Sequence, residues 1–327
     1  MIGQLGVVVV NYGSSALLET NLAPLAEALP EAVVVVVDNR TDGRERSRVL
    51  ALGAEHGWHV VTPEGNLGFG LGMNAGVAEA KRAGATRFLL LNPDATIDPS
   101  SVALLAAALD ENPLALVAPR ILRPDGSVWF DGSDLHLDDG RITATRRRAA
   151  ADDPRLEQWL SGACLMVGAE LWERIGGFGD GYFLYWEDVE LSFRARRAGA
   201  QVQVVPSATA VHAEGGTQGD GLERSGAAKS EGYYYFNIRN RLVFAARNLP
   251  EEQVRRWRRA ALPIAWEVLL QGGRRQFLRP VRPVRAAVRG VRDGLRATSA
   301  GCLSGVPAPI GATRTPKKGH ATEDFSE

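Results

Sequence analysis

The stretch Phe88-Leu89-Leu90-Leu91-Asn92-Pro93-Asp94-Ala95 decides the fold. An unbroken apolar run is typical of a strand that is buried on both faces of a sheet, and Pro93 cannot continue such a strand in its interior. We therefore expect Asp94 at the carboxyl end of a central strand. Open α/β sheets bind their ligands at that end of their strands, so the stretch predicts both a sheet and the edge that carries its site.

Earlier segments repeat this pattern of a buried strand followed by polar residues. The run 5–10 ends at Asn11-Tyr12, and the valine run 33–37 ends at Asp38-Asn39. Helix-like stretches over 15–29 and 43–56, a strand over 59–61, and a glycine-rich loop with a helix over 65–83 complete the alternation. This order predicts an α/β fold with a Rossmann-like, mostly parallel central sheet flanked by helices.

Beyond residue 100 the alternation is less regular. We expect strands over 116–118, 161–167 and 201–205, and helices over 101–110, 169–175, 187–197 and 229–247. The region 123–155 is rich in Asp, Gly and Arg, which predicts an irregular or hairpin excursion over the site.

Composition limits the function classes. Lys and Arg number 38, as do Asp and Glu, so the net charge of the 327-residue chain is zero and gives no general basis for binding nucleic acid. Cys164 and Cys302 provide no disulfide framework and fit a reducing cytosol. We find neither a signal-peptide layout nor a run near the roughly 20 apolar residues that span a bilayer. These features predict a cytoplasmic protein.

The composition shifts after residue 248. Arg, Pro, Val and Leu dominate 249–297, and a Gly-, Pro-, Ser- and Lys-rich tail over 298–327 is expected to be disordered. Arginines recur at three- and four-residue spacing between apolar residues: Arg279, Arg282, Arg285, Arg289, Arg292 and Arg296, with Val281, Val284, Val288, Val291 and Leu295. As a helix, this basic amphipathic extension either lies on an anionic membrane surface or is a solvated surface helix.

Two features of the first 100 residues point to a nucleotide. Asp38 either caps the next segment or bonds the base or ribose of a nucleotide at its strand end. The glycines of the stretch 65–76 either let the backbone approach a phosphate at a helix N-terminus or only make a tight strand-to-helix turn. The stretch is not a Walker loop, because no Gly-Lys-Ser/Thr follows.

Acidic side chains and one histidine are the candidates for metal binding and catalysis. Asp94 suits a divalent cation such as Mg²⁺, which is typically held by one or two carboxylates plus substrate phosphates. Glu187 and Asp188 either offer a base that takes a hydroxyl proton or only favour the dipole of the helix that they open. His212 is either a ligand of a metal or diphosphate or a structural histidine.

Together these pieces resemble the family 2 glycosyltransferases, which have the GT-A fold, and within them the rhamnosyltransferase-like branch that builds cell-wall or surface polysaccharides. The motifs that carry the resemblance follow the family's order over residues 5–247: Val9-Val10-Asn11-Tyr12, Val37-Asp38-Asn39, Asn66-Leu67-Gly68-Phe69-Gly70, Asn74-Ala75-Gly76, Leu91-Asn92-Pro93-Asp94, Gly162-Ala163, Gly176-Gly177-Phe178, Tyr185-Trp186-Glu187-Asp188-Val189-Glu190-Leu191 and His212.

The resemblance implies an inverting transfer of a sugar, such as rhamnose, from a dTDP- or UDP-linked donor to a hydroxyl of a saccharide or a polyprenyl-diphosphate-linked acceptor. Asp188 is then the catalytic base with Glu187 beside it, and Asp94 and His212 hold Mg²⁺ or Mn²⁺. Asn92 stands where the family's Asp-X-Asp motif has its first aspartate. The implied donor contacts are Asn11, Tyr12, Asp38, Asn66, Gly68, Phe69, Asn74, Asn92, Asp94 and Arg239, and the implied acceptor contacts are Gly162, Ala163, Trp186 and Glu187.

The resemblance also divides the chain. Residues 1–248 form the GT-A domain, with a nucleotide-sugar-binding half over 1–100 and an acceptor-binding half over 101–248. The protein then works in the cytoplasm, at the inner face of the cell membrane if the extension binds lipid. Two alternatives stay open. One is a non-catalytic membrane-associated scaffold, and the other is a sugar-nucleotide pyrophosphorylase, which needs a basic, glycine-rich signature where this chain has Asn11-Tyr12-Gly13-Ser14.

Overall fold

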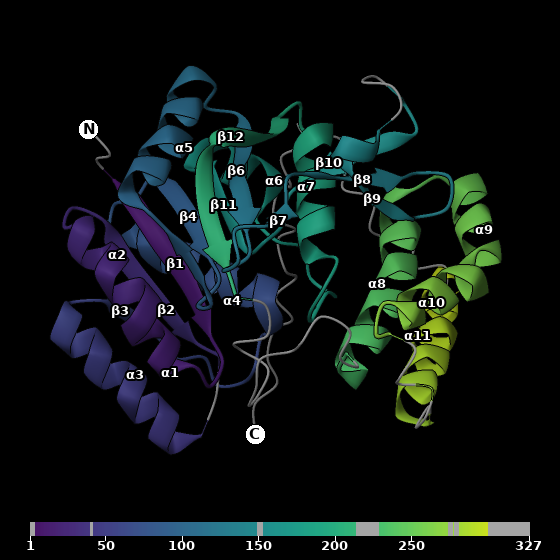
Figure 1. Cartoon of the computed structure of the whole chain (residues 1–327), viewed down its shortest axis with the longest axis horizontal. Helices are drawn as coiled ribbons and strands as arrows, with labels where there is room; N and C mark the ends of the chain where they lie inside the picture. The colour runs from purple at the N-terminus through teal and green to yellow at the C-terminus, as the bar shows by residue number, and fades with distance from the viewer. Residues whose placement is uncertain are drawn as a thin grey trace, which may run out of the picture.

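A computed structural model describes residues 4–39, 42–148, 153–213, 229–273, 277 and 281–299. Figure 1 shows a large sheet with helices packed on it and a second group of helices, α8 to α11, to one side. The tail expected to be disordered lies outside the described residues from 300 onward, as do Arg279 and Cys302.

The N-terminal half of the large sheet is parallel, as predicted. Its strands lie in the order β3-β2-β1-β4, and the register pairs Asn11 with Asp38, so the polar residues that end β1 and β2 are neighbours. The strands are β1 (Leu5–Asn11), β2 (Val33–Asp38), β3 (His59–Val61) and β4 (Arg87–Leu91). The connecting helices are α1 (Ser15–Leu17), the π-helical turn η1 (Leu18–Leu22), α2 (Ala23–Ala28), α3 (Gly43–His56) and α4 (Gly68–Arg82).

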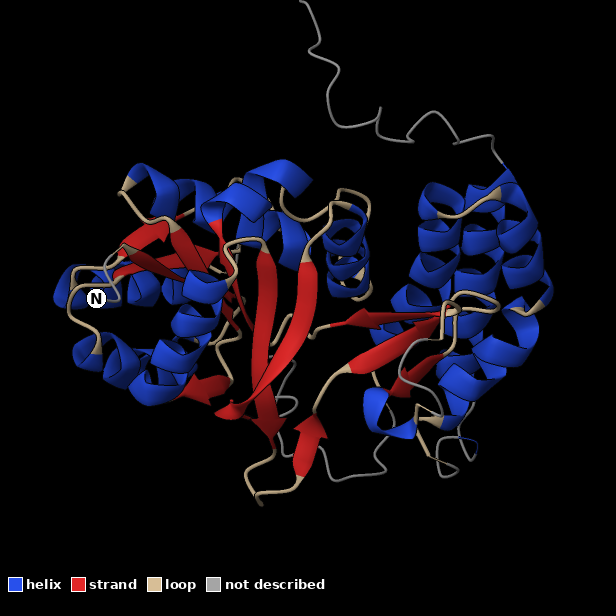
Figure 2. Cartoon of the chain, turned by 90° about the horizontal axis from the view of Figure 1, so that it is seen from above, coloured by secondary structure: helices blue, strands red, loops and turns tan. Residues whose placement is uncertain are grey.

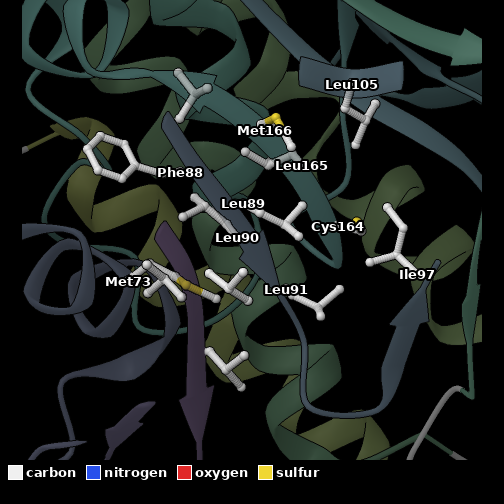
Figure 3. Packing of buried hydrophobic residues seen from close by; sticks show 14 of the residues in the cluster. Met73, Phe88, Leu89, Leu90, Leu91, Ile97, Leu105, Cys164, Leu165 and Met166 are labelled. Atoms are coloured by element: carbon white, nitrogen blue, oxygen red, sulfur yellow. The ribbon is translucent and has the colours of Figure 1, made fainter. Parts of the chain in front are cut away.

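The other half of the large sheet is mixed. The strand β11 (Cys164–Gly168) runs antiparallel between β4 and β6 (Ala115–Leu122), and Figure 3 shows its side chains beside those of β4 in the core. The strand β12 (Gln201–His212) is parallel to β6, while β5 (Ala95–Ile97) and β7 (Val128–Phe130) pair antiparallel at the rim. The predicted end of β12 at 205 was wrong, because the strand continues past an irregularity between Val205 and Thr209 and includes His212.

Smaller elements complete this part of the chain. The excursion predicted over 123–155 supplies two strands of an ordered three-stranded sheet, and β10 directly after it completes the order β10-β8-β9; this sheet lies between the large sheet and the C-terminal helices (Figure 2). Its elements are β8 (Ser133–His136), β9 (Ile142–Ala144), the 3₁₀ turn η2 (Thr145–Arg147) and β10 (Leu156–Trp159). The predicted helices are present as α5 (Pro99–Glu111), α6 (Ala169–Ile175) and α7 (Glu187–Arg197).

The four C-terminal helices share one hydrophobic core with α7. They are α8 (Glu231–Asn248), α9 (Glu251–Arg259), α10 (Ala261–Leu270) and α11 (Val281–Ser299). The core joins Val189 and Phe193 of α7 to Phe244, Trp257 and Val291, so the boundary expected at 248 falls inside it. Val291 was expected on the amphipathic surface and is instead 8% exposed, because it packs into this core. None of the described helices is long and apolar enough to cross a membrane.

The glycine-rich stretch forms the first turns of helix α4 and not a loop. A Cβ on Gly76 would lie 2.4 Å from Cγ1 of Val8, and a Cβ on Gly70 would lie 2.9 Å from the Cβ of Phe178. These glycines let α4 approach strand β1 and the turn before α7 more closely than any side chain would allow. The interpretation of the stretch as a phosphate-binding loop is therefore corrected for the glycines inside the helix, which are packing residues.

Gly68 is the one glycine of this stretch whose backbone conformation also requires it. Its φ is +77°, and a Cβ would lie 2.2 Å from the carbonyl oxygen of Phe183. We expect Gly68→Ala to lower the free energy of unfolding by about 3 kcal/mol or more, since left-handed strain and overpacking each cost roughly 1–3 kcal/mol. Urea unfolding measures this. Gly43→Ala, at a position with no neighbouring atom within 4 Å, is the control and should change stability by less than about 0.5 kcal/mol. Equal stabilities for the two variants would contradict the prediction.

Candidate active site

Two hydrogen bonds join the edge that carries Asp94 to the start of α7. The backbone N–H of Asn92 donates to the carbonyl oxygen of Ala163 (2.9 Å), and the backbone N–H of Gly162 donates to Oδ2 of Asp188 (3.0 Å). The end of β4, the turn before β11 and the first turn of α7 therefore meet at one place, although they are far apart in the sequence. The structure thus brings the predicted metal residue and the predicted base to two adjoining walls.

Asp188 lies half-buried at the N-terminus of α7, and backbone hydrogen bonds hold its carboxylate. Its Oδ1 accepts a hydrogen bond from the N–H of Val189 (2.8 Å) in addition to the bond from Gly162. Burial raises the pKa of the Asp188 carboxyl to about 6, although both N–H groups act in the opposite direction. A carboxylate with a pKa near the working pH is suited to accept a proton and release it again.

Glu187 is buried beside Asp188 and differs from it in its hydrogen bonding. The side chain is 5% exposed, and its Oε2 has no hydrogen-bond partner among the described residues. Burial, and then repulsion from Asp188, raise the pKa of the Glu187 carboxyl well above its ordinary value. Two neighbouring carboxyl groups in low dielectric do not both ionise easily. Burial and the repulsion between the two groups therefore favour the proton on Glu187 and the charge on Asp188.

The backbone just before this pair is strained. Tyr185 and Trp186 both have positive φ, at 66° and 76°, a conformation that is rare for bulky side chains. The buried amide of Asn240, on α8, donates to the carbonyl oxygens of Leu184 and Tyr185, each at 2.9 Å. Asn240 thus clamps the segment that aims α7 and its first residues at the site. Sequence reasoning missed this residue.

Replacing Asn240 tests this clamp. We expect Asn240→Leu, which keeps the volume but removes both donors, to lower the free energy of unfolding by about 2 kcal/mol or more, because two buried carbonyls lose their partners. We also expect it to lower kcat and to leave the KM for the donor nearly unchanged, because the base is displaced while the donor wall is not. Asn248→Leu at the end of α8, where the amide donates to the carbonyl oxygen of Phe244 in its own helix, is the control. A variant of Asn240 with unchanged kcat would refute the positioning role.

Asp94 and His212 face each other on the other wall. Nε2 of His212 lies 3.1 Å from Oδ1 of Asp94, and both residues are buried. The N–H of Ala213 donates to the carbonyl oxygen of Asp94, which fixes the end of β12 against this turn. Trp129 of β7 packs its ring 4.6 Å from the His212 ring. Sequence reasoning missed Trp129 because it lies in the irregular excursion.

This pair fits a divalent cation. Two ligands in adjacent positions of an octahedral Mg²⁺, each about 2.1 Å from it, lie about 3.0 Å apart, which matches the distance between Nε2 and Oδ1. The other nitrogen of His212, Nδ1, is buried without a hydrogen-bond partner among the described residues. No group of three His, Cys, Asp or Glu side chains surrounds a cation position in the described part of the chain. Further ligands therefore have to come from the diphosphate, water or Asn92.

Asp38 and Asn11 lie at the far end of the same sheet edge. Asp38 is fully buried, and its Oδ2 accepts a hydrogen bond from Nε of Arg46 on α3 (2.7 Å). Asn11 is also fully buried and leaves its Nδ2 without a partner among the described residues, while Tyr12 next to it is 53% exposed. A buried amide donor and an exposed aromatic ring at a strand end are groups that can recognise a nucleobase.

Asn39 organises the entry to α4 and was not among the predicted donor contacts. Its Nδ2 donates to the carbonyl oxygen of Gly68 (2.9 Å), and its Oδ1 accepts from the N–H of Leu67 (2.8 Å). Asn66, which was predicted, accepts a hydrogen bond from the N–H of Gly68 and is exposed. The motif Val37-Asp38-Asn39 was the signal for Asn39, but the sequence does not disclose that its amide points back to the chain.

Three predicted contacts have other uses. The amide of Asn74 is engaged by the backbone of Phe178, as both donor and acceptor. Trp186 is 5% exposed and packs against Phe244 and Trp257, so its assignment to the acceptor site is corrected to a core residue. Arg239 donates to the carbonyl oxygen of Gly181 (3.1 Å) and so braces the segment before α7.

Phe69 and Gly162 lie between the two walls. A Cβ on Gly162 would meet the Phe69 ring at 3.0 Å and the Cβ of Asp188 at 3.5 Å. The N–H of Phe69 donates to the carbonyl oxygen of Phe183 (3.0 Å), which ties α4 to the segment before α7. The predicted acceptor contacts Gly162 and Ala163 therefore adjoin the predicted base, and the predicted donor contact Phe69 touches them.

Comparison with known sequences agrees with this geometry. A profile described as glycosyltransferase like family 2 matches residues 3–225. An N-acetylglucosaminyl-diphospho-decaprenol L-rhamnosyltransferase of Mycobacterium tuberculosis is 30% identical over 266 residues, which cover 71% of this chain and 83% of that protein. The dTDP-rhamnosyl transferase RfbF of Shigella flexneri is 24% identical and covers 60% of this chain and 65% of its own length.

Comparison with solved structures concerns the fold. The mannosyltransferase PcManGT of Pyrobaculum calidifontis, solved with GDP-Man and Mn²⁺, superposes with a TM-score of 0.52 at 16% identity, over 92% of this chain and 87% of that one. Identity this low supports the shared architecture alone. The architecture is the GT-A fold, as predicted.

Proposed function

The chain belongs to glycosyltransferase family 2, and from this premise we propose that it is an inverting rhamnosyltransferase of cell-wall or surface polysaccharide synthesis. Its donor is a nucleotide-diphosphate sugar, and dTDP-rhamnose is preferred to UDP-sugars. Its acceptor is a saccharide hydroxyl on a polyprenyl diphosphate at the inner face of the membrane. The names of the two rhamnosyltransferase relatives support these choices. The scaffold and pyrophosphorylase alternatives lose their basis, because the matching family and the relatives are glycosyltransferases, which transfer the sugar and not the nucleotidyl group.

One observation carries the proposal. The hydrogen bonds from Asn92 to Ala163 and from Gly162 to Asp188 join the strand end that carries Asp94 to the start of α7, which supports a metal wall beside the wall of the base. A transferase that uses a diphosphate leaving group needs both walls. One stabilises the charge that develops on the diphosphate, and the other accepts the proton of the attacking hydroxyl.

The reaction follows from these positions. The acceptor hydroxyl binds over Gly162 and Ala163 and gives its proton to the Asp188 carboxylate as its oxygen forms a bond to the anomeric carbon. The bond from that carbon to the diphosphate oxygen breaks on the opposite face, and its electron pair leaves with the nucleotide diphosphate, so the configuration inverts. When bound between Asp94 and His212, Mg²⁺ or Mn²⁺ supplies Lewis-acid stabilisation of the diphosphate.

Glu187 and the strand-end residues have supporting roles. A protonated Glu187 can donate its O–H to an acceptor oxygen without competing with Asp188 for the proton. Asp38, Asn11 and Tyr12 form the nucleoside end of the site, where Nδ2 of Asn11 has no hydrogen-bond partner among the residues that the structure describes. Trp129, beside His212, offers an apolar wall near the sugar.

The activity should depend on pH through Asp188. Burial raises the pKa of Asp188 to about 6. The ionised carboxylate required as base is therefore fully present only above that pH and is protonated as the pH falls through it. We expect kcat/KM for the acceptor to fall on the acidic side with a midpoint near pH 6. A pH–rate profile from about pH 4.5 to 8 measures this. A midpoint near 4, the value of an exposed aspartate, would contradict the proposed environment.

The donor is tested by binding and then by transfer. A thermal-shift screen against dTDP-, UDP- and GDP-sugars, each with and without Mn²⁺, should show the largest stabilisation with dTDP-rhamnose and the metal, because ligands of the folded state raise its stability. Transfer to a short-chain polyprenyl-diphosphate N-acetylglucosamine should then require the same pair. Stabilisation without any transfer to saccharide acceptors would count against the proposed function.

A further inference from the structure

Helices α10 and α11 expose one surface that combines apolar and basic side chains. We propose that this surface, which we call the α10–α11 face (Leu262, Trp266, Leu270, Val281, Val284, Arg285, Val288, Arg289 and Arg292), docks on an anionic lipid bilayer. The inference deepens the proposed function, because it names the surface that would bring the site to a lipid-linked acceptor. Its test needs no substrate.

The inner side of α11 is fixed by packing against α8. A Cβ on Gly290 would lie 2.8 Å from the carbonyl oxygen of Tyr235, and a Cβ on Gly294 would lie 2.8 Å from Cδ1 of Leu242. Ala286 and Ala287 are also buried. This small-residue side lets two helices approach closely, as Figure 1 shows for α8 and α11. The opposite side of α11 is therefore held outward.

That outer side carries large apolar residues. Val281 is 74% exposed, Val288 61% and Val284 38%, and they follow one another at three- and four-residue spacing. Arg285, Arg289 and Arg292 line the same patch of surface. The Arg289 guanidinium lies over the Tyr235 ring, and Asp293, bonded to Arg292, is the one acidic residue within the described helix. The patch is thus positively charged and apolar at once.

Helix α10 packs beside α11 and adds exposed apolar side chains. Leu262, Trp266 and Leu270 recur every four residues on one side of the helix and are 71%, 53% and 43% exposed. The Trp266 ring packs 5.5 Å from that of Phe277, which precedes α11 in the chain. Exposed Trp and Leu beside arginines are typical of helices that lie in the membrane interface.

Charge and hydrophobicity together select the partner. An acidic protein would pair with the arginines but would gain little from exposed valines and leucines, whereas anionic lipid headgroups lie directly above an apolar phase. Basic residues near such a surface each contribute about 1 kcal/mol, and buried apolar side chains add to this. The face therefore fits a bilayer that contains anionic lipid.

Vesicle co-sedimentation of the full chain tests the proposal. We expect binding to vesicles of 30% phosphatidylglycerol in phosphatidylcholine (roughly the anionic share of a surface that attracts basic segments) and at least about tenfold weaker binding to pure phosphatidylcholine. Arg285→Gln with Arg289→Gln should weaken binding about 30-fold. Val281→Ser with Val288→Ser should weaken it on both lipid mixtures. Matched controls on α3, Arg44→Gln with Arg48→Gln and Leu50→Ser, remove exposed residues of the same kinds and should bind like the wild type.

The outcomes separate this inference from the proposed function. Circular dichroism confirms that each variant folds. No vesicle binding by the wild type, or equal loss in the α3 controls, would overturn the docking surface even if the enzyme transfers sugar. Self-association that the valine variants abolish would also overturn it, in favour of a dimer interface. Wild-type binding by an enzyme without transferase activity would instead refute the proposed function alone.

Discussion

Asp188→Asn should lower kcat by about 1,000-fold and leave donor affinity within a factor of about two, since a general base contributes roughly 10²–10⁴-fold and does not contact the donor diphosphate. The amide is nearly isosteric and can still accept the N–H of Gly162. It also removes a charge that burial disfavours, as the raised pKa indicates. The variant should therefore be at least as stable as the wild type at neutral pH. Kinetics, donor titration calorimetry and thermal unfolding measure the three effects.

Glu187→Gln is the matched control for this substitution. Because burial and the neighbouring Asp188 favour the protonated form of Glu187, the neutral amide resembles that form and should lower kcat by less than about tenfold. The comparison assigns the base to one of two adjacent carboxyl groups. If Glu187→Gln is the dead variant and Asp188→Asn turns over at the wild-type rate, the two roles are reversed.

Asp94→Asn should lower kcat/KM for the donor by about 100-fold or more. The cation that stabilises the diphosphate then loses its charged protein ligand. His212→Gln should have a smaller effect in the same direction, since the carboxylate remains. Both variants should weaken Mn²⁺ binding followed by electron paramagnetic resonance in the presence of the nucleotide diphosphate. Chelation with EDTA should abolish transfer in the wild type, and added Mn²⁺ or Mg²⁺ should restore it.

The control for Asp94 is Asp110→Asn, which removes an exposed carboxylate of helix α5 that pairs with Arg87 of β4. It should leave Mn²⁺ binding unchanged. Full activity of Asp94→Asn in EDTA would show that this enzyme needs no metal and that Asp94 and His212 form a structural hydrogen bond.

Local patterns in the sequence were sufficient to predict the parallel half of the fold. The valine and leucine runs of β1, β2 and β4 are buried on both sides, and polar residues stand at or directly after the carboxyl end of each strand. Such a pattern is visible without any knowledge of partners. The antiparallel insertion of β11 and the full length of β12 were not predictable in this way, because pairing between distant segments decides them.

The predicted site shows the same difference between local motifs and contacts of distant segments. Asp94, His212, Gly162 and Asp188 were recognised from their motifs, and the structure brings them together through backbone contacts. Asn74 and Trp186 belong to equally clear motifs, yet their side chains serve packing, because a motif does not show which way a side chain points. Asn240 acts on backbone carbonyls more than 50 residues away in the chain, and no local pattern reveals such a partner.

The stereochemistry of the product tests the central claim most directly. NMR of the disaccharide formed from dTDP-rhamnose and the lipid-linked acceptor reports the anomeric configuration of the transferred sugar. If Asp188 deprotonates a hydroxyl that attacks opposite the leaving diphosphate, the configuration is inverted relative to the donor, and Asp188→Asn forms this product about 1,000-fold more slowly. A product with retained configuration would contradict the single in-line displacement between the two walls of this site.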